Sequence, residues 1–100
     1  PEPVLREIAV FSFERNTPRD SLLFTEGTLA KYLYVVATGK YKIFKASPNG
    51  QEQTLHIQGP GSLIAEAAIF DSGKYPANCQ AMENSTVITI DGEKFIIFLK

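Results

Sequence analysis

Short apolar runs rich in β-branched and aromatic residues dominate the chain, separated by glycine, proline and asparagine at spacings of roughly 8 to 12 residues. Runs of this length and composition are typical of strands rather than helices. The pattern therefore predicts a mostly β domain. The predicted strands cover residues 8–13, 21–24, 32–37, 40–46, 51–58, 75–82 and 85–90.

Glycine and asparagine mark the predicted reversals between these strands. Asn49-Gly50 is a strong hairpin signal, because the two central positions of the favoured tight turn require positive φ. Thr38-Gly39 predicts a second tight reversal, so residues 32–58 are expected to form a three-stranded meander. Gly27 is expected to supply positive φ in an earlier turn.

Two helical segments interrupt and end the strand pattern. Residues 59–61 break the sheet, and the alanine-rich run that follows predicts a short helix starting near Ala65 or Glu66. Asp91 predicts the N-cap of an amphipathic terminal helix. The mixed charges of residues 13–20 predict an exposed loop. Many short strands with one small helix and a terminal helix predict a double-stranded β-helix, or jelly roll.

Composition and charge narrow the class of protein. One hundred residues with 44% hydrophobic and 21% charged content predict a single globular domain. A net charge of -1 gives no general attraction to phosphate backbones, so any DNA contact is expected to come from another domain. Cys79 is the single cysteine, which excludes an internal disulfide framework. With no apolar run of membrane-spanning length, we expect a cytoplasmic protein that contacts no membrane.

Glu66 and His56 are the polar residues whose settings raise a question of function. A carboxylate among apolar residues costs free energy unless it is hydrogen-bonded. Glu66 is therefore expected either to accept hydrogen bonds from a ligand, or to cap its own helix or reach water. His56 alternates with Leu55 and Ile57, so it is expected to face solvent if those two face the core.

The remaining candidate side chains have ordinary structural explanations beside the functional ones. Cys79 and Met82 are potential soft ligands, but a buried cysteine more often acts as a small hydrophobe. Tyr75 is a candidate for either core or pocket. A lone histidine without a nucleophile motif argues against an enzyme. The other tyrosines, expected to fill the core, are Tyr32, Tyr34 and Tyr41.

Four motifs follow one another along residues 7–98: LLFTEGTLAKYLYVVATGKYKIFK, GPGSLIAEAAIF, YPANCQA and STVITIDGEKF. With them the chain resembles the cyclic nucleotide-binding domain of the Crp/Fnr superfamily of bacterial transcription factors. Gly27, Gly39 and Gly61 fall where that family places its turn glycines. The resemblance implies the jelly roll with a short cassette helix and a C-terminal helix.

The resemblance implies that residues 61–81 form a ligand-binding cassette whose helix amides face a bound anion. Glu66 matches the family glutamate that accepts a hydrogen bond from the ribose 2′-hydroxyl. The ligand-binding residues that it implies are Leu63, Ile64, Ala65, Glu66, Ala67, Ala68, Tyr75, Pro76 and Ala77.

Several positions depart from the pattern of family members that bind cyclic nucleotides. Tyr75 stands where those members carry an arginine that pairs with the cyclic phosphate, and Pro76 lacks the backbone N–H of the usual residue. Losing the arginine contact weakens phosphate binding by about one to two orders of magnitude. Ala65 replaces a glycine, and Lys74 is a weak substitute for the missing cation. We therefore expect an effector other than cyclic AMP.

The resemblance also implies a larger protein. We expect residues 1–100 to be an effector domain excised from a homodimeric regulator, with the dimerisation helix starting near Asp91 and a DNA-binding domain beyond Lys100. DNA contact is then expected only through that further domain. No metal and no cofactor are expected, with haem kept as an alternative. The alternative function is a regulatory module of a kinase, channel or transporter, or a structural roll that binds no ligand.

Overall fold

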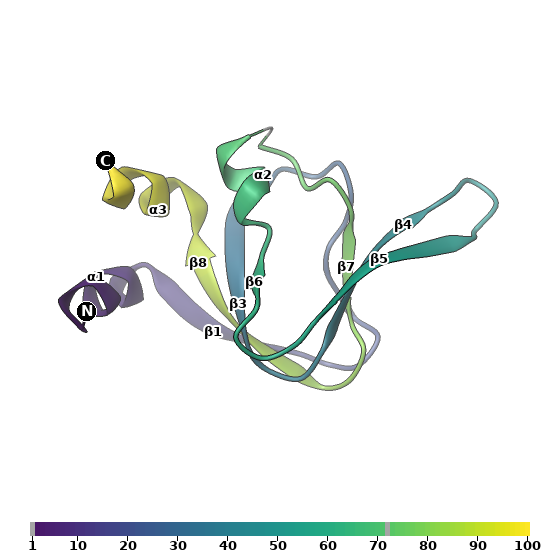
Figure 1. The fold of residues 1–100 in the computed structure, drawn as a ribbon, viewed down its shortest axis with the longest axis horizontal. Coiled ribbons are helices and arrows are strands. Elements are labelled where there is room, and N and C mark those ends of the chain that lie inside the picture. Colours follow the sequence, from purple (N-terminus) through teal and green to yellow (C-terminus); the bar gives the residue numbers. More distant parts are fainter. Residues whose placement is uncertain (1, 72) are drawn as a thin grey trace.

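The computed structural model describes residues 2–71 and 73–100 and shows two four-stranded antiparallel sheets on either side of one core (Figure 1). The first sheet has the strand order β1-β8-β3-β6, and the second has the order β2-β7-β4-β5. This arrangement confirms the predicted jelly roll. The strands are β1 Ser12–Thr17, β2 Leu22–Phe24, β3 Tyr32–Thr38, β4 Tyr41–Ala46, β5 Glu52–Gln58, β6 Leu63–Ile64, β7 Asn78–Ala81 and β8 Ser85–Asp91.

Alternation of side chains builds the core between the sheets. In β8, Ser85, Val87 and Thr89 are buried, because every second residue of a strand points to the same face. Tyr41 of β4 donates a buried hydrogen bond of 2.9 Å to the Thr17 hydroxyl of β1, which joins the two sheets directly. The main core cluster contains Leu23, Tyr34, Val36, Tyr41, Ile64, Ala68, Tyr75, Cys79, Ala81 and Val87.

The predicted meander of residues 32–58 is wrong. β3 pairs with β6 and β8 in the first sheet, whereas β4 pairs with β5 and β7 in the second. Gly39, at φ +89°, lies where the chain passes from one sheet to the other beside Ser85. The Asn49-Gly50 hairpin is confirmed: β4 and β5 pair antiparallel and extend away from the body of the roll (Figure 1).

The N-terminal prediction is also wrong. Residues 8–13 were expected to be a strand, but helix α1 spans Glu2–Val10 and β1 begins at Ser12. The charge run predicted as a loop instead supplies most of β1, with Glu14 and Arg15 exposed on the strand. An edge strand tolerates charged side chains, and β1 pairs only with β8.

The two predicted helices are confirmed. Helix α2 spans Glu66–Phe70, and α3 spans Gly92–Leu99. The Asp91 carboxylate accepts a 2.9 Å hydrogen bond from the Lys94 amide, as expected of an N-cap. Among the described residues, no helix is both long and apolar enough to span a bilayer.

Gly39→Ala is expected to destabilise the fold more than Gly27→Ala. Both glycines have positive φ, but a Cβ at Gly39 meets the Ser85 Cα at 2.8 Å, whereas nothing lies within 4 Å at Gly27. Both variants suffer the same kind of backbone strain, so overpacking should make the loss of stability in Gly39→Ala larger by about 1–3 kcal/mol. Chemical denaturation of both variants measures this difference. Equal losses of stability would show that Ser85 can move away from the added Cβ without a cost in free energy.

Candidate functional site

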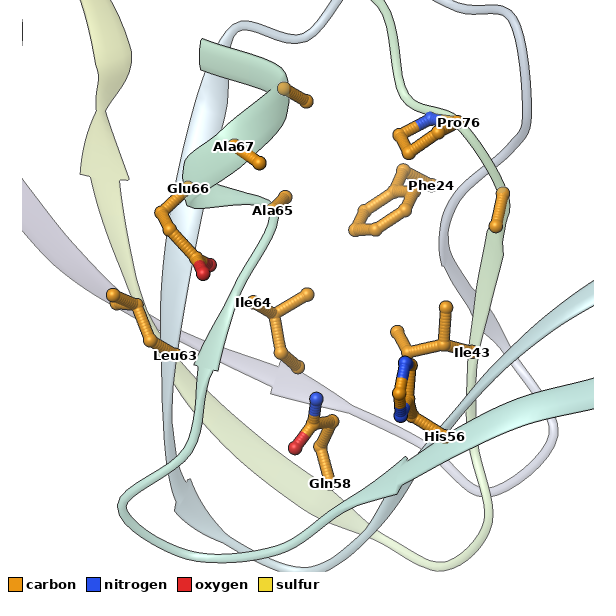
Figure 2. Close-up of a pocket in the computed structure, with 12 residues that line it drawn as sticks. Phe24, Ile43, His56, Gln58, Leu63, Ile64, Ala65, Glu66, Ala67 and Pro76 are labelled. Atoms are coloured by element: carbon orange, nitrogen blue, oxygen red, sulfur yellow. The ribbon is translucent and has the colours of Figure 1, made fainter. Parts of the chain in front are cut away.

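A cavity of about 320 Å³ lies between the two sheets, next to α2 (Figure 2). One wall comes from β4 and β5, and the opposite wall from β6 and α2. Phe24 of β2 and the segment leading into β7 complete it. The lining residues are Phe24, Ile43, His56, Gln58, Leu63, Ile64, Ala65, Glu66, Ala67, Ala68, Pro76 and Ala77.

The structure brings most of the sequence-predicted site residues to this one cavity. The exception is Tyr75, which does not line it although Pro76 and Ala77 do. Lys74 is also not on its wall; it forms an isolated bridge with Leu29. The predicted residues that line the cavity are Leu63, Ile64, Ala65, Glu66, Ala67, Ala68, Pro76 and Ala77.

Tyr75 is turned into the core. Its ring stacks on Phe24 with centroids 3.9 Å apart and planes 13° apart, and the residue is only 4% exposed. Its hydroxyl donates to the Tyr32 carbonyl at 2.9 Å and accepts from the Tyr32 amide at 3.3 Å. The Tyr75 side chain therefore links the segment before β7 to the backbone at the start of β3. It also packs against Phe24, whose ring lines the cavity.

Four lining residues were missed by the sequence reasoning: Phe24, Ile43, His56 and Gln58. The condition that Leu55 and Ile57 face the core is not met, since they are 41% and 58% exposed. His56 is exposed, as expected, but the face it shares with Gln58 lines the cavity. The two-residue period of a strand places His56 and Gln58 on the same face of β5. Ile43 is the residue of β4 that pairs with His56, so it borders the same cavity.

Three polar side chains reach the cavity, and none has a hydrogen-bond or ion-pair partner among the described residues: Glu66, His56 and Gln58. Glu66 is half-buried at the start of α2, and its carboxylate accepts no bond from that helix. The structure therefore does not support the alternative in which Glu66 caps its own helix. A half-buried carboxylate beside a cavity favours a ligand that donates a hydrogen bond.

Ala65, which precedes Glu66, has a left-handed backbone with φ 71° and ψ 15°. It is the N-cap of α2 and provides no side-chain capping bond. A left-handed conformation costs a residue with a β-carbon about 1–2 kcal/mol. The position that turns the chain into α2 is thus strained, and the Ala65 methyl group narrows the cavity at this point.

The soft side chains lie apart from this cavity. Cys79 is fully buried, and burial raises the pKa of its thiol to about 12. It therefore behaves as a small hydrophobe, while Met82 lies on the surface. No cluster of three or more histidine, cysteine or carboxylate side chains suited to a metal ion occurs in the part of the chain that the structure describes.

The fold and this pocket define the class of protein. The family model described as cyclic nucleotide-binding domain matches residues 14–100, so the chain belongs to that family. It is 33% identical to the cyclic AMP receptor protein of Thermus thermophilus over 101 aligned positions, which cover all of this chain and 46% of that relative. The chain therefore spans about half the length of this curated relative.

Solved structures support the same assignment. The sensor domain of the transcriptional regulator DNR from Pseudomonas aeruginosa matches with a TM-score of 0.92 and 27% identity, over 99% of this chain and 67% of that one. The catabolite activator protein of Thermus thermophilus matches with a TM-score of 0.86 and 28% identity, over 99% of this chain and 46% of that one. These relatives confirm the resemblance to Crp/Fnr regulators.

Tyr75→Phe is expected to lower the free energy of unfolding by about 1–2 kcal/mol, because both hydrogen bonds to Tyr32 disappear from a buried site. Tyr32→Phe is the matched control, since the Tyr32 hydroxyl has no hydrogen-bond partner among the described residues. The control should change stability by no more than about 0.5 kcal/mol. Equal losses of stability in the two variants, measured by urea denaturation, would show that the Tyr75 hydrogen bonds to Tyr32 do not stabilise the fold.

Ala65→Gly is expected to stabilise the domain by about 0.5–1 kcal/mol, because relief of the left-handed strain exceeds the added flexibility of the unfolded chain. Ala67→Gly, two residues later within α2, should instead destabilise it by about 0.5–1 kcal/mol. Thermal and urea denaturation measure both changes. A loss of stability in Ala65→Gly would show that the left-handed backbone at this position costs less than we infer.

Proposed function

We propose that this chain is the effector-sensing domain of a Crp/Fnr-type transcription regulator and that it controls a DNA-binding domain allosterically. The names of the similar proteins support this proposal: a cyclic AMP receptor protein, a catabolite activator protein and the sensor domain of a transcriptional regulator. In the proposal the full-length protein is a cytoplasmic homodimer that contacts DNA only through its further domain. It is not an enzyme, and it needs no cofactor.

The effector in this proposal is a small molecule other than cyclic AMP. The main support for it is Tyr75, which the resemblance aligns with the family arginine and whose neutral side chain is buried in the core against Phe24. No lysine or arginine is among the residues that line the cavity. A phosphate there would meet Glu66 and no opposite charge, which is unfavourable in a partly desolvated site.

Contacts between α2 and α3 provide a route from the pocket to the end of the domain. Phe70 of α2 lies against Phe95 of α3, with ring centroids 6.2 Å apart. A Cβ at Gly92 would come within 2.5 Å of the Ile69 Cδ1, so the two helices meet closely. A ligand that contacts α2 and prefers one position of this helix pair shifts the population toward it.

Calorimetric titration with cyclic AMP and cyclic GMP tests the choice of effector. Neither nucleotide is expected to bind at micromolar concentration, because the arginine contact and the Pro76 backbone N–H are missing. The Thermus thermophilus cyclic AMP receptor protein, titrated with cyclic AMP alongside, is the positive control. A micromolar dissociation constant for either nucleotide with this domain would contradict the proposal.

A further inference from the structure

Glu66, His56 and Gln58 reach the same cavity from two opposite walls. Figure 2 shows Gln58 and His56 rising from β5, with Glu66 across the cavity at the start of α2. None of these side chains has a polar partner among the described residues. Polar groups that gather unpaired around one cavity are the usual means by which a pocket orients a ligand.

The chemistry of these three groups restricts the ligand. An ionised carboxylate only accepts hydrogen bonds, whereas an amide and an imidazole can each donate and accept. A fitting ligand therefore brings at least one N–H or O–H donor to Glu66. Its remaining polar atoms can be donors or acceptors, because Gln58 and His56 match either.

The charge of the pocket opposes anions. Glu66 is the lining residue with a formal charge at pH 7, and the nearby lysines of β4 are engaged elsewhere. Lys42 pairs with Glu52 at 2.8 Å, and Lys45 lies 3.8 Å from Glu26. Helix α2 has five residues and a strained N-cap, so it adds no substantial anion site of its own.

The rest of the wall is apolar. Phe24 presents its ring to the cavity, and Ile43, Ile64 and Pro76 surround the same space (Figure 2). A volume of about 320 Å³ is at the lower end of the range for ligand pockets. A compact flat ring system fits these walls better than a flexible or highly polar molecule.

We propose that this pocket binds a small, uncharged or cationic aromatic molecule with an N–H or O–H donor group, and that it discriminates against anions. Glu66 accepts from the donor group, while His56 and Gln58 determine specificity at the opposite polar edge. This inference rests on the proposed sensing function, because it assigns a ligand class to the same pocket.

Three fragments that share one ring test the charge preference: benzamidine, which is cationic, benzamide, which is neutral, and benzoate, which is anionic. Each is titrated into the ¹⁵N-labelled domain, and amide shifts of α2, β5 and β6 report binding in the pocket. Benzamidine and benzamide are expected to bind, with benzamidine at least about tenfold tighter than benzoate.

Matched variants assign the preference to individual residues. Glu66→Gln should reduce the ratio of benzamidine to benzoate affinity to less than about threefold, because the attractive charge is gone. Glu14→Gln is the control: it removes the same charge from the exposed side of β1, away from the pocket, at a side chain without an ion-pair partner among the described residues, and the ratio should stay unchanged. His56→Leu should weaken benzamide binding about three- to tenfold through the lost hydrogen bond.

The outcomes separate this inference from the proposed function. Benzoate binding as tightly as benzamidine in the pocket would overturn the ligand class and leave the sensing function intact. An unchanged affinity ratio in Glu66→Gln would overturn the role of Glu66, and unchanged benzamide binding in His56→Leu would overturn that of His56. If none of the fragments shifts any amide of the pocket, the inference fails, whereas micromolar binding of cyclic AMP would contradict the proposed choice of effector instead.

Discussion

The stacking of Tyr75 on Phe24 is the contact on which the rest of the site depends. The Tyr75 hydroxyl makes two hydrogen bonds to the Tyr32 backbone, which connect the segment before β7 to the first residue of β3. The stacked Phe24 ring then forms part of the pocket wall. Because Tyr75 is neutral and turned into the core, its side chain brings no positive charge to the cavity.

The described residues that line the pocket consequently include one carboxylate and no lysine or arginine. Burial makes such an imbalance more important than it would be on the surface, since water screens charges poorly in a cavity. Glu66 remains available as an acceptor, and His56 and Gln58 add polar contacts across from it. In our proposal, ligand selection in this pocket is therefore governed by donor groups and shape.

The position of α2 suits a sensor. On one side it lines the pocket, and on the other it packs closely against α3 through Ile69 and Gly92. Its first turn begins after the strained Ala65, and strained backbone often occurs where a segment has alternative arrangements. A small displacement of α2 on ligand binding would also move α3, because closely packed helices transmit such a shift rather than absorb it.

Local patterns in the sequence determined β2 to β5, β7 and β8, the Asn49-Gly50 hairpin, the α2 and α3 helices and the Asp91 N-cap, because each depends on near neighbours in the chain. The sequence also placed Glu66 in an apolar run, which marked it as a candidate ligand contact. The partition of β3 and β4 between two sheets was decided only by the tertiary structure, because pairing partners lie far apart in sequence. The same holds for the side of β5 on which the exposed His56 borders the cavity, and for the burial of Tyr75. The strand period tells which residues share a face, and only packing decides what that face meets.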